Sequence, residues 1–180
     1  MAKLENKLKP EKIKIGILGG TFDPAHKGHL EISKQAKKRF GLKNIIWAIT
    51  KQNPFKNESK SNLRSRMQFA KKIIGKNKYI KVKFYEKKIG SNRTIDLIKH
   101  LTKNKKNEIY FIMGADNLIN FHKWYKWKSI VKNCNILVFD RQGYKAKSLK
   151  SVTFNGVNNK NLTFINFNKV NISSSQLRKV

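Results

Sequence analysis

Two histidines near the start of the chain flank a glycine, directly after a short apolar run and at the start of a segment with helical spacing. Residues 19–29 are Gly-Gly-Thr-Phe-Asp-Pro-Ala-His-Lys-Gly-His. The pair Gly19 and Gly20 lets the backbone approach a phosphate closely, and a helix N-terminus favours an anion. His26 and His29 share one face of a helix, and Gly28 leaves room for a nucleotide. No matching third metal ligand follows nearby, so phosphate binding is favoured over zinc binding.

A second candidate phosphate site lies at the end of the sequence. Residues 172–178 are Ile-Ser-Ser-Ser-Gln-Leu-Arg, within a short helix predicted over 173–179. Hydroxyls at a helix start, followed one turn later by Arg178, suit the β- and γ-phosphates of a nucleotide. Alone, this pattern is typical of an ordinary helix cap, so its weight comes from its pairing with the histidines.

Apolar runs alternate with segments of helical spacing along the whole chain. This alternation predicts an α/β fold, a doubly wound and mainly parallel sheet of five to six strands, in a single domain over 1–180. Ligands bind such sheets beyond the carboxyl ends of the strands, near the point where strand order reverses. Polar, asparagine-rich residues 142–161 predict a loop. The predicted strands are 12–19, 44–50, 79–85, 108–113, 135–139 and 162–167, and the predicted helices 29–40, 62–74, 94–101, 116–131 and 173–179.

The composition excludes several classes of function. The 180 residues include 41 Lys and Arg against 10 Asp and Glu, too few carboxylates for a calcium cage or a di-iron site. The single cysteine, Cys134, excludes an intramolecular disulfide and a cysteine-rich zinc site. No apolar run approaches the roughly 18 residues of a membrane-spanning helix. We therefore expect a cytoplasmic protein without membrane contact.

The formal net charge of +31 has two interpretations. Lys and Arg release counterions from phosphate backbones, as in a nucleic-acid-binding module. Here the lysines are scattered without a basic arm, as codon bias toward Lys, Asn and Ile would place them. We expect no specific nucleic-acid binding, and favour attraction of a small anionic substrate.

The histidine motif resembles the His-x-Gly-His signature of the nucleotidyltransferase superfamily, whose members transfer adenylyl or cytidylyl groups. Residues 172–178 resemble its second signature, Ile-Ser-Ser-Thr-x-Ile-Arg, with Ser175 in place of threonine. Residues 53–56, 91–97 and 114–127 are similar to segments of nicotinate-nucleotide adenylyltransferases. The resemblance covers about residues 12–178 and implies a Rossmann-like nucleotidyltransferase fold.

The chain departs from this family's pattern at three positions. Phe55 stands where a loop histidine is usual, so that Lys56 would carry the anion contact of the loop. Arg93 replaces the tyrosine before Thr94, and Gln142 replaces a proline after the fifth predicted strand.

The resemblance implies transfer of an adenylyl group from ATP to nicotinate mononucleotide, giving nicotinate adenine dinucleotide and pyrophosphate. It assigns His26, His29 and Arg178 to catalysis, through stabilisation of charge on the transferred phosphoryl and the leaving group. The implied cofactor is Mg²⁺ bound mainly through the ATP phosphates, with no protein metal site. The implied ATP-binding residues are Gly19, Gly20, Thr21, Phe22, Lys56, Gly114, Asp116, Ser174, Ser175 and Arg178, and the implied nicotinate mononucleotide-binding residues are Thr94 and Trp124.

Some of these assignments have a structural alternative. Asp116 suits ribose hydroxyls but equally suits a helix cap. Trp124 suits stacking on the pyridine ring, although aromatics on such a segment usually belong to the core, where we place Trp127. Thr94 is a candidate contact for the pyridine carboxylate, and Asp23 is expected to brace its own turn.

Two other functions stay open at this point. A sister adenylyltransferase would prefer nicotinamide mononucleotide or phosphopantetheine. Trp124 and the segment at Thr94 argue against phosphopantetheine but do not separate the acid from the amide. A non-catalytic nucleic-acid-binding module of the same fold would lack one phosphate-binding motif, whereas both are present.

Overall fold

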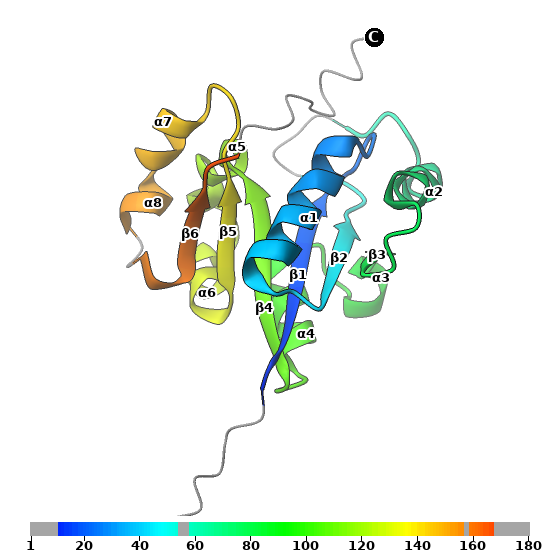
Figure 1. Ribbon diagram of the computed structural model, residues 1–180, viewed down its shortest axis with the longest axis horizontal. Helices are drawn as coiled ribbons and strands as arrows, with labels where there is room; N and C mark the ends of the chain where they lie inside the picture. The colour runs from blue at the N-terminus through cyan, green and yellow to red at the C-terminus, as the bar shows by residue number, and fades with distance from the viewer. Residues whose placement is uncertain (1–10, 54–57, 157–158, 168–180) are drawn as a thin grey trace, which may run out of the picture.

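One parallel sheet organises the protein (Figure 1). The structure, a computed structural model, describes residues 11–53, 58–156 and 159–167. Its sheet has six strands in the order β3-β2-β1-β4-β5-β6, and every neighbouring pair is parallel. The predicted doubly wound sheet is thereby confirmed, and strand order reverses between β1 and β4. The strands are β1 Ile13–Gly20, β2 Asn44–Ile49, β3 Ile80–Lys83, β4 Asn107–Gly114, β5 Asn135–Phe139 and β6 Leu162–Ile165.

Helices cover both faces of the sheet, because the strands are apolar on both sides. Ile17 and Leu18 are consecutive in β1 and point into different clusters of the core. The Leu18 face packs under α1 (Lys27–Phe40) and α2 (Leu63–Ile74), whereas the Ile17 face packs under α4 (Thr94–Thr102) and α6 (Trp127–Asn133). In Figure 1, α1 crosses in front of β1 while α4 and α6 lie behind the sheet. The predicted helices 29–40, 62–74 and 94–101 correspond to α1, α2 and α4.

The single helix predicted over 116–131 is wrong. The segment breaks into α5 (Ala115–Leu118), a 3-10 turn η1 (Phe121–Lys123) and α6, with Trp124 extended and Lys126 at φ 51°. In a continuous helix, each step of three residues turns the side-chain direction by about 60° around the helix axis, so Phe121, Trp124 and Trp127 would point in three different directions. The break lets the rings of Trp124 and Trp127 both pack on buried Phe121, at centroid distances of 5.0 Å and 6.5 Å.

The loop predicted over 142–161 is also wrong. It contains α7 (Lys145–Leu149), α8 (Val152–Gly156) and η2 (Asn159–Asn161). Its buried residues are polar, with Ser148 and Thr153 fully buried and Ser151 nearly so. These helices therefore carry no apolar periodicity by which the sequence could have predicted them. A further short helix, α3 (Glu86–Ile89), lies in a stretch for which no helix was predicted.

The helix predicted over 173–179 lies outside the described residues. Within the described part of the chain, no helix has both the length and the apolar character needed to cross a membrane.

Candidate active site

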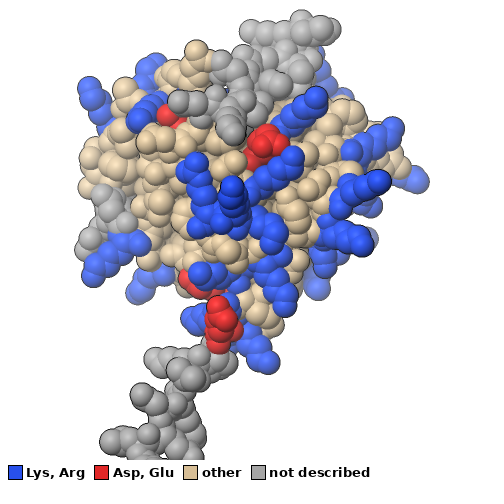
Figure 2. Space-filling view, viewed as in Figure 1, with Lys and Arg blue, Asp and Glu red and all other residues tan. Residues whose placement is uncertain are grey.

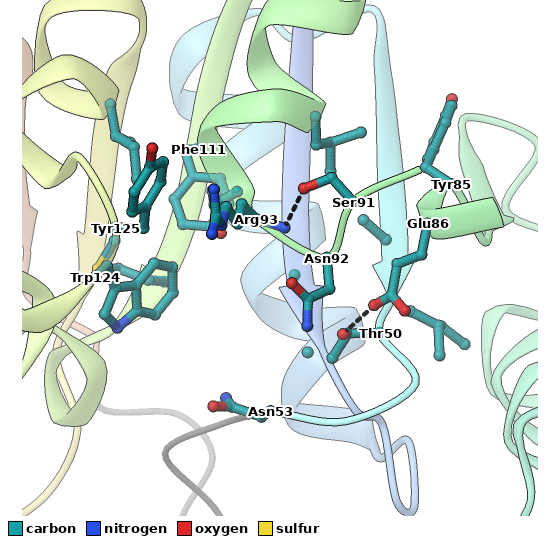
Figure 3. A pocket seen from close by; sticks show the side chains of 18 of the residues that line it. Thr50, Asn53, Tyr85, Glu86, Ser91, Asn92, Arg93, Phe111, Trp124 and Tyr125 are labelled. Carbon is teal, nitrogen blue, oxygen red and sulfur yellow. Dashed lines mark hydrogen bonds between the residues drawn. The ribbon is translucent and has the colours of Figure 1, made fainter. Parts of the chain in front are cut away.

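A cavity of about 390 Å³ opens at the carboxyl ends of β1, β2 and β4. Gly19 and Gly20 line it from β1, Thr50 from the end of β2 and Met113 from β4. This is where strand order reverses, so the position of the cavity is the one expected for a doubly wound sheet. In Figure 3, Trp124 and Tyr125 stand on one side of the cavity, Tyr85 and Glu86 on the other, and Arg93 and Asn92 between them.

His26 and His29 form a reciprocal cap at the start of α1. The Nδ1 of His26, the N-cap residue, accepts a hydrogen bond of 3.1 Å from the Gly28 N–H. The Nδ1 of His29 accepts one of 3.2 Å from the His26 N–H. A nitrogen that accepts carries no proton, so we assign the proton of each neutral ring to Nε2. The ring centroids lie 3.8 Å apart. The start of the helix thus carries two adjacent Nε2–H groups, which are suitable hydrogen-bond donors to phosphate oxygens.

A buried aromatic support fixes the position of His29. The Phe22 ring lies 4.7 Å from the His29 ring and stacks at 5.1 Å on Trp47. Trp47 Nε1 donates to Ser33 Oγ over 2.8 Å, and Ser33 Oγ donates to the His29 carbonyl over 2.8 Å. Phe22 adopts φ 49°, a left-handed conformation that a bulky residue keeps only where its surroundings enforce it. The Phe22 side chain is therefore a support beneath His29, buried in the core.

Arg66, to which sequence analysis assigned no role, ties together the loops behind the cavity. Its side chain is only 3% exposed. Nη1 donates to the carbonyls of Thr21 (2.6 Å) and Thr50 (2.9 Å), Nη2 to that of Lys51 (3.0 Å) and Nε to that of Ser61 (3.0 Å). Burial lowers the pKa of the Arg66 guanidinium, against the opposing effect of nearby carboxylates. The guanidinium joins the ends of β1 and β2 to α2.

Asp23 has a structural role in the same region. Its buried carboxylate accepts a hydrogen bond of 2.7 Å from the Lys60 N–H, and so braces the chain that follows β1 against the start of the α2 segment.

Asp116, the candidate ribose contact, lies beyond the end of β4. Its Oδ2 forms an ion pair of 2.8 Å with Nη1 of Arg141, a residue that sequence analysis did not assign. A Cβ atom on Gly114 would lie 2.5 Å from Asp116 Oδ1. Glycine at position 114 is therefore required for this placement of the carboxylate.

Thr94 and Trp124, the candidate mononucleotide contacts, both line the cavity. Thr94 is the first residue of α4. Trp124 is partly buried, with its ring edge-on to Phe111 at 6.0 Å. Trp127 packs against the core as expected, at its margin. Burial raises the pKa of Tyr85, another residue of the cavity wall.

The candidate site therefore has two adjoining parts. Gly19, Gly20, Thr94 and Trp124 line the cavity. His26, His29, Thr21 and Phe22 lie beside it, where the end of β1 leads into α1, and Gly114 and Asp116 lie beyond β4. Lys56, Ser174, Ser175 and Arg178 lie outside the described residues.

Positive charge is spread widely over the face of the molecule that carries α1 (Figure 2). Figure 2 shows Lys and Arg spread across the visible face, with few Asp or Glu among them. Such a distribution raises the local concentration of small anions rather than marking out one polymer track.

A parallel sheet with a pair of histidines at its switch point defines a nucleotide-binding transferase of the nucleotidyltransferase class. The profile of the cytidylyltransferase-like family matches residues 17–180. The chain is 79% identical, over the full length of both sequences, to a probable nicotinate-nucleotide adenylyltransferase of Pelagibacter ubique. A protein of the same description from Agrobacterium fabrum is 37% identical over 139 residues, 76% of this chain and 74% of its own.

A solved structure shares the fold. The nicotinic acid mononucleotide adenylyltransferase of Plasmodium falciparum, complexed with NaAD, superposes with a TM-score of 0.73 at 21% identity, over 92% of this chain and 82% of its own. The chain belongs to the cytidylyltransferase-like family and, within it, to the nicotinate-nucleotide adenylyltransferases.

Proposed function

We propose that the protein transfers the adenylyl group of ATP to nicotinate mononucleotide, producing nicotinate adenine dinucleotide and pyrophosphate, a step of NAD biosynthesis. The observation that carries this proposal is the position of the histidine pair. It lies just after the carboxyl end of β1, beside a cavity that Trp124 helps to line. A phosphate site and an aromatic ring site thus adjoin, as the two substrates of such a transfer require.

In the proposed reaction the mononucleotide phosphate attacks the α-phosphorus of ATP in line, and the bond to the β-phosphate oxygen breaks. No covalent enzyme intermediate forms. The attacking phosphate is already ionised, so the protein needs no strong base, and positioning and charge stabilisation do the work. The Nε2–H groups of His26 and His29 would stabilise charge on the α-phosphate and the departing pyrophosphate.

Other residues hold the ends of ATP in this proposal. Ser174, Ser175 and Arg178 would bind the β- and γ-phosphates, with Lys56 as a second cation. The backbone at 19–22 would line the crevice, where a Cβ atom on Gly20 would lie 3.6 Å from the Phe22 ring. Asp116, held by Arg141, would accept hydrogen bonds from the adenosine ribose.

Trp124 and Thr94 would bind the pyridine nucleotide, by stacking and by contact with the ring carboxylate. The first N–H groups of α4, at Thr94 and Ile95, precede the helix's own hydrogen-bond ladder, and the N-cap residue provides no side-chain cap. These donors suit a carboxylate better than an amide.

We propose that magnesium is carried by the ATP phosphates, where it offsets charge on the leaving pyrophosphate. No group of three His, Cys, Asp or Glu side chains in the described ranges is arranged to hold a metal ion. Asp116 and Asp23, two carboxylates beside the proposed nucleotide path, are engaged with Arg141 and Lys60. Because both carboxylates already have partners, they fit a metal ion that is held mainly by oxygens of the substrate. We also propose a single domain over 1–180 and a cytoplasmic location, where ATP is available.

The experiment that tests this function supplies ATP and Mg²⁺ with each of three acceptors: nicotinate mononucleotide, nicotinamide mononucleotide and phosphopantetheine. With nicotinate mononucleotide we expect nicotinate adenine dinucleotide and pyrophosphate in equal amounts, separated by chromatography. Phosphopantetheine is expected to give no adenylylated product. Transfer to phosphopantetheine alone would contradict the proposal and favour the sister enzyme.

A further inference from the structure

Arg93 places a cation in the wall of the cavity, next to the ring site. It is the N-cap residue of α4 and replaces the tyrosine usual in the family. Its guanidinium carbon lies 3.9 Å from the centroid of the Tyr125 ring. Tyr125 directly follows Trp124, so the guanidinium is held beside the proposed stacking surface (Figure 3). A cation–π contact is not a hydrogen bond, and therefore leaves the N–H donors of the guanidinium for a ligand.

The nearby carboxylates do not neutralise Arg93. Glu86 accepts hydrogen bonds from the Thr50 hydroxyl and from the Lys51 N–H, the latter over 3.0 Å. Asp96 accepts a hydrogen bond of 2.7 Å from the Ser91 hydroxyl. Among the described residues the ion pairs are Lys34–Glu31 and Arg141–Asp116, and neither involves Arg93.

Arg93 and the histidine pair approach the ligand from opposite faces of the sheet. Arg93 precedes α4, which packs on the Ile17 face, whereas His26 and His29 begin α1 on the Leu18 face. The phosphate of a bound mononucleotide must lie at the histidines, where the adenylyl group is transferred. Arg93 would therefore contact the other end of the mononucleotide, which is the pyridine ring with its substituent.

We propose that Arg93 is a specificity-determining residue, which binds the carboxylate of a planar aromatic acid stacked on Trp124. The inference rests on the proposed function and assigns to a side chain what backbone donors alone would otherwise do. A guanidinium matches a carboxylate with two parallel N–H···O bonds. A carboxamide offers one oxygen and sets its NH₂ group against the same donors, so the amide substrate gains much less from Arg93.

The test measures kcat/KM for nicotinate and nicotinamide mononucleotides in the same set of variants. R93Q is expected to lower the value for nicotinate mononucleotide by about tenfold to a hundredfold, and that for the amide by less than about threefold. Arg93→Lys keeps the charge without the fork and should restore only part of the loss, because one ammonium cannot pair with both carboxylate oxygens in the same way. Arg93→Met serves as a second neutral variant should R93Q fail to fold.

Two comparison variants separate this role of Arg93 from ring stacking and from the general electrostatic attraction of the protein's other cations. Trp124→Ala should raise KM for both mononucleotides alike and leave their ratio unchanged, because stacking does not distinguish an acid from an amide. Lys128→Gln removes a cation that contacts Trp127 outside the cavity, and should change neither value.

The possible outcomes are distinct. Equal losses for both mononucleotides in R93Q would overturn the inference, since Arg93 would then hold the shared phosphate or the fold. Unchanged kinetics in R93Q would overturn it as well. Neither result would affect the proposed function, which fails only if the unaltered protein makes no dinucleotide from ATP and nicotinate mononucleotide.

Discussion

His26→Asn and His29→Gln are each expected to lower kcat for dinucleotide formation at least about a hundredfold, the usual cost of losing one charge-stabilising donor. These substitutions are chosen because both histidines also cap α1. Asparagine is a good N-cap residue and glutamine a good third residue of a capping box, so the helix start survives while the imidazole is lost. Alanine variants would lose the cap and the donor together.

The measurement combines steady-state kinetics with circular dichroism and thermal unfolding. His100→Ala is the matched control, because His100 lies on α4 with its ring near Tyr85, outside the residues that line the cavity. It should retain nearly full turnover. Near-normal kcat in His26→Asn or His29→Gln would contradict the phosphate role of that histidine and leave it a helix cap.

Arg66→Met is expected to lower the free energy of unfolding by roughly 2–5 kcal/mol, as removal of a buried charged group with several hydrogen bonds does. Four backbone carbonyls would lose their donor, among them those of Thr21 and Thr50 at the mouth of the cavity. Arg66→Lys should rescue little of this loss, since one ammonium cannot replace the planar fork.

Denaturant unfolding followed by circular dichroism checks this prediction, with Arg64→Met as its control. Arg64 lies two residues earlier on α2 and is exposed, so its loss should change the free energy of unfolding by less than about 0.5 kcal/mol. Equal losses in the two variants would show that Arg66 does not hold the loops together.

Local patterns were sufficient for the sheet and for three helices that cover it. The inner strands are short, mainly apolar runs because they are buried on both faces, whereas the edge strand β3 alternates as Ile-Lys-Val-Lys. The predicted helices over 29–40 and 62–74 failed only at their ends, and the first of these begins earlier because His26 supplies the cap. The pattern failed at 116–131, where the chain breaks into α5, η1 and α6 and two tryptophan rings pack on Phe121.

The residues of the site divide in the same way. The glycine pair and the histidines were predictable because their chemistry lies in adjacent positions. Arg66 was not, since its partner Thr21 is 45 positions away. One signal could have found it, however. Arg66 falls three residues after Leu63 and four before Ala70, on the apolar face of α2, where an arginine needs buried partners.

Arg141 and Phe22 illustrate two further limits. Arg141 follows β5, and its partner Asp116 follows β4, so only the pairing of these strands brings them together. Phe22 belongs to the glycine-rich string, which suggested a role in lining the crevice. Its left-handed backbone turns the ring onto Trp47 and leaves the backbone for that role, and no local pattern specifies the turn.

The central claim is a cavity built for a pyridine nucleotide that carries a ring carboxylate. It is tested most directly by the ratio of kcat/KM for nicotinate mononucleotide to that for nicotinamide mononucleotide, with ATP saturating in the unaltered protein. If a bound amide leaves the N–H donors of Thr94 and Ile95 unpaired, each unpaired donor costs roughly 1–3 kcal/mol. The account therefore predicts a ratio between about thirtyfold and about twenty-thousandfold, by a factor of ten per about 1.4 kcal/mol. Equal values for the two mononucleotides would contradict it.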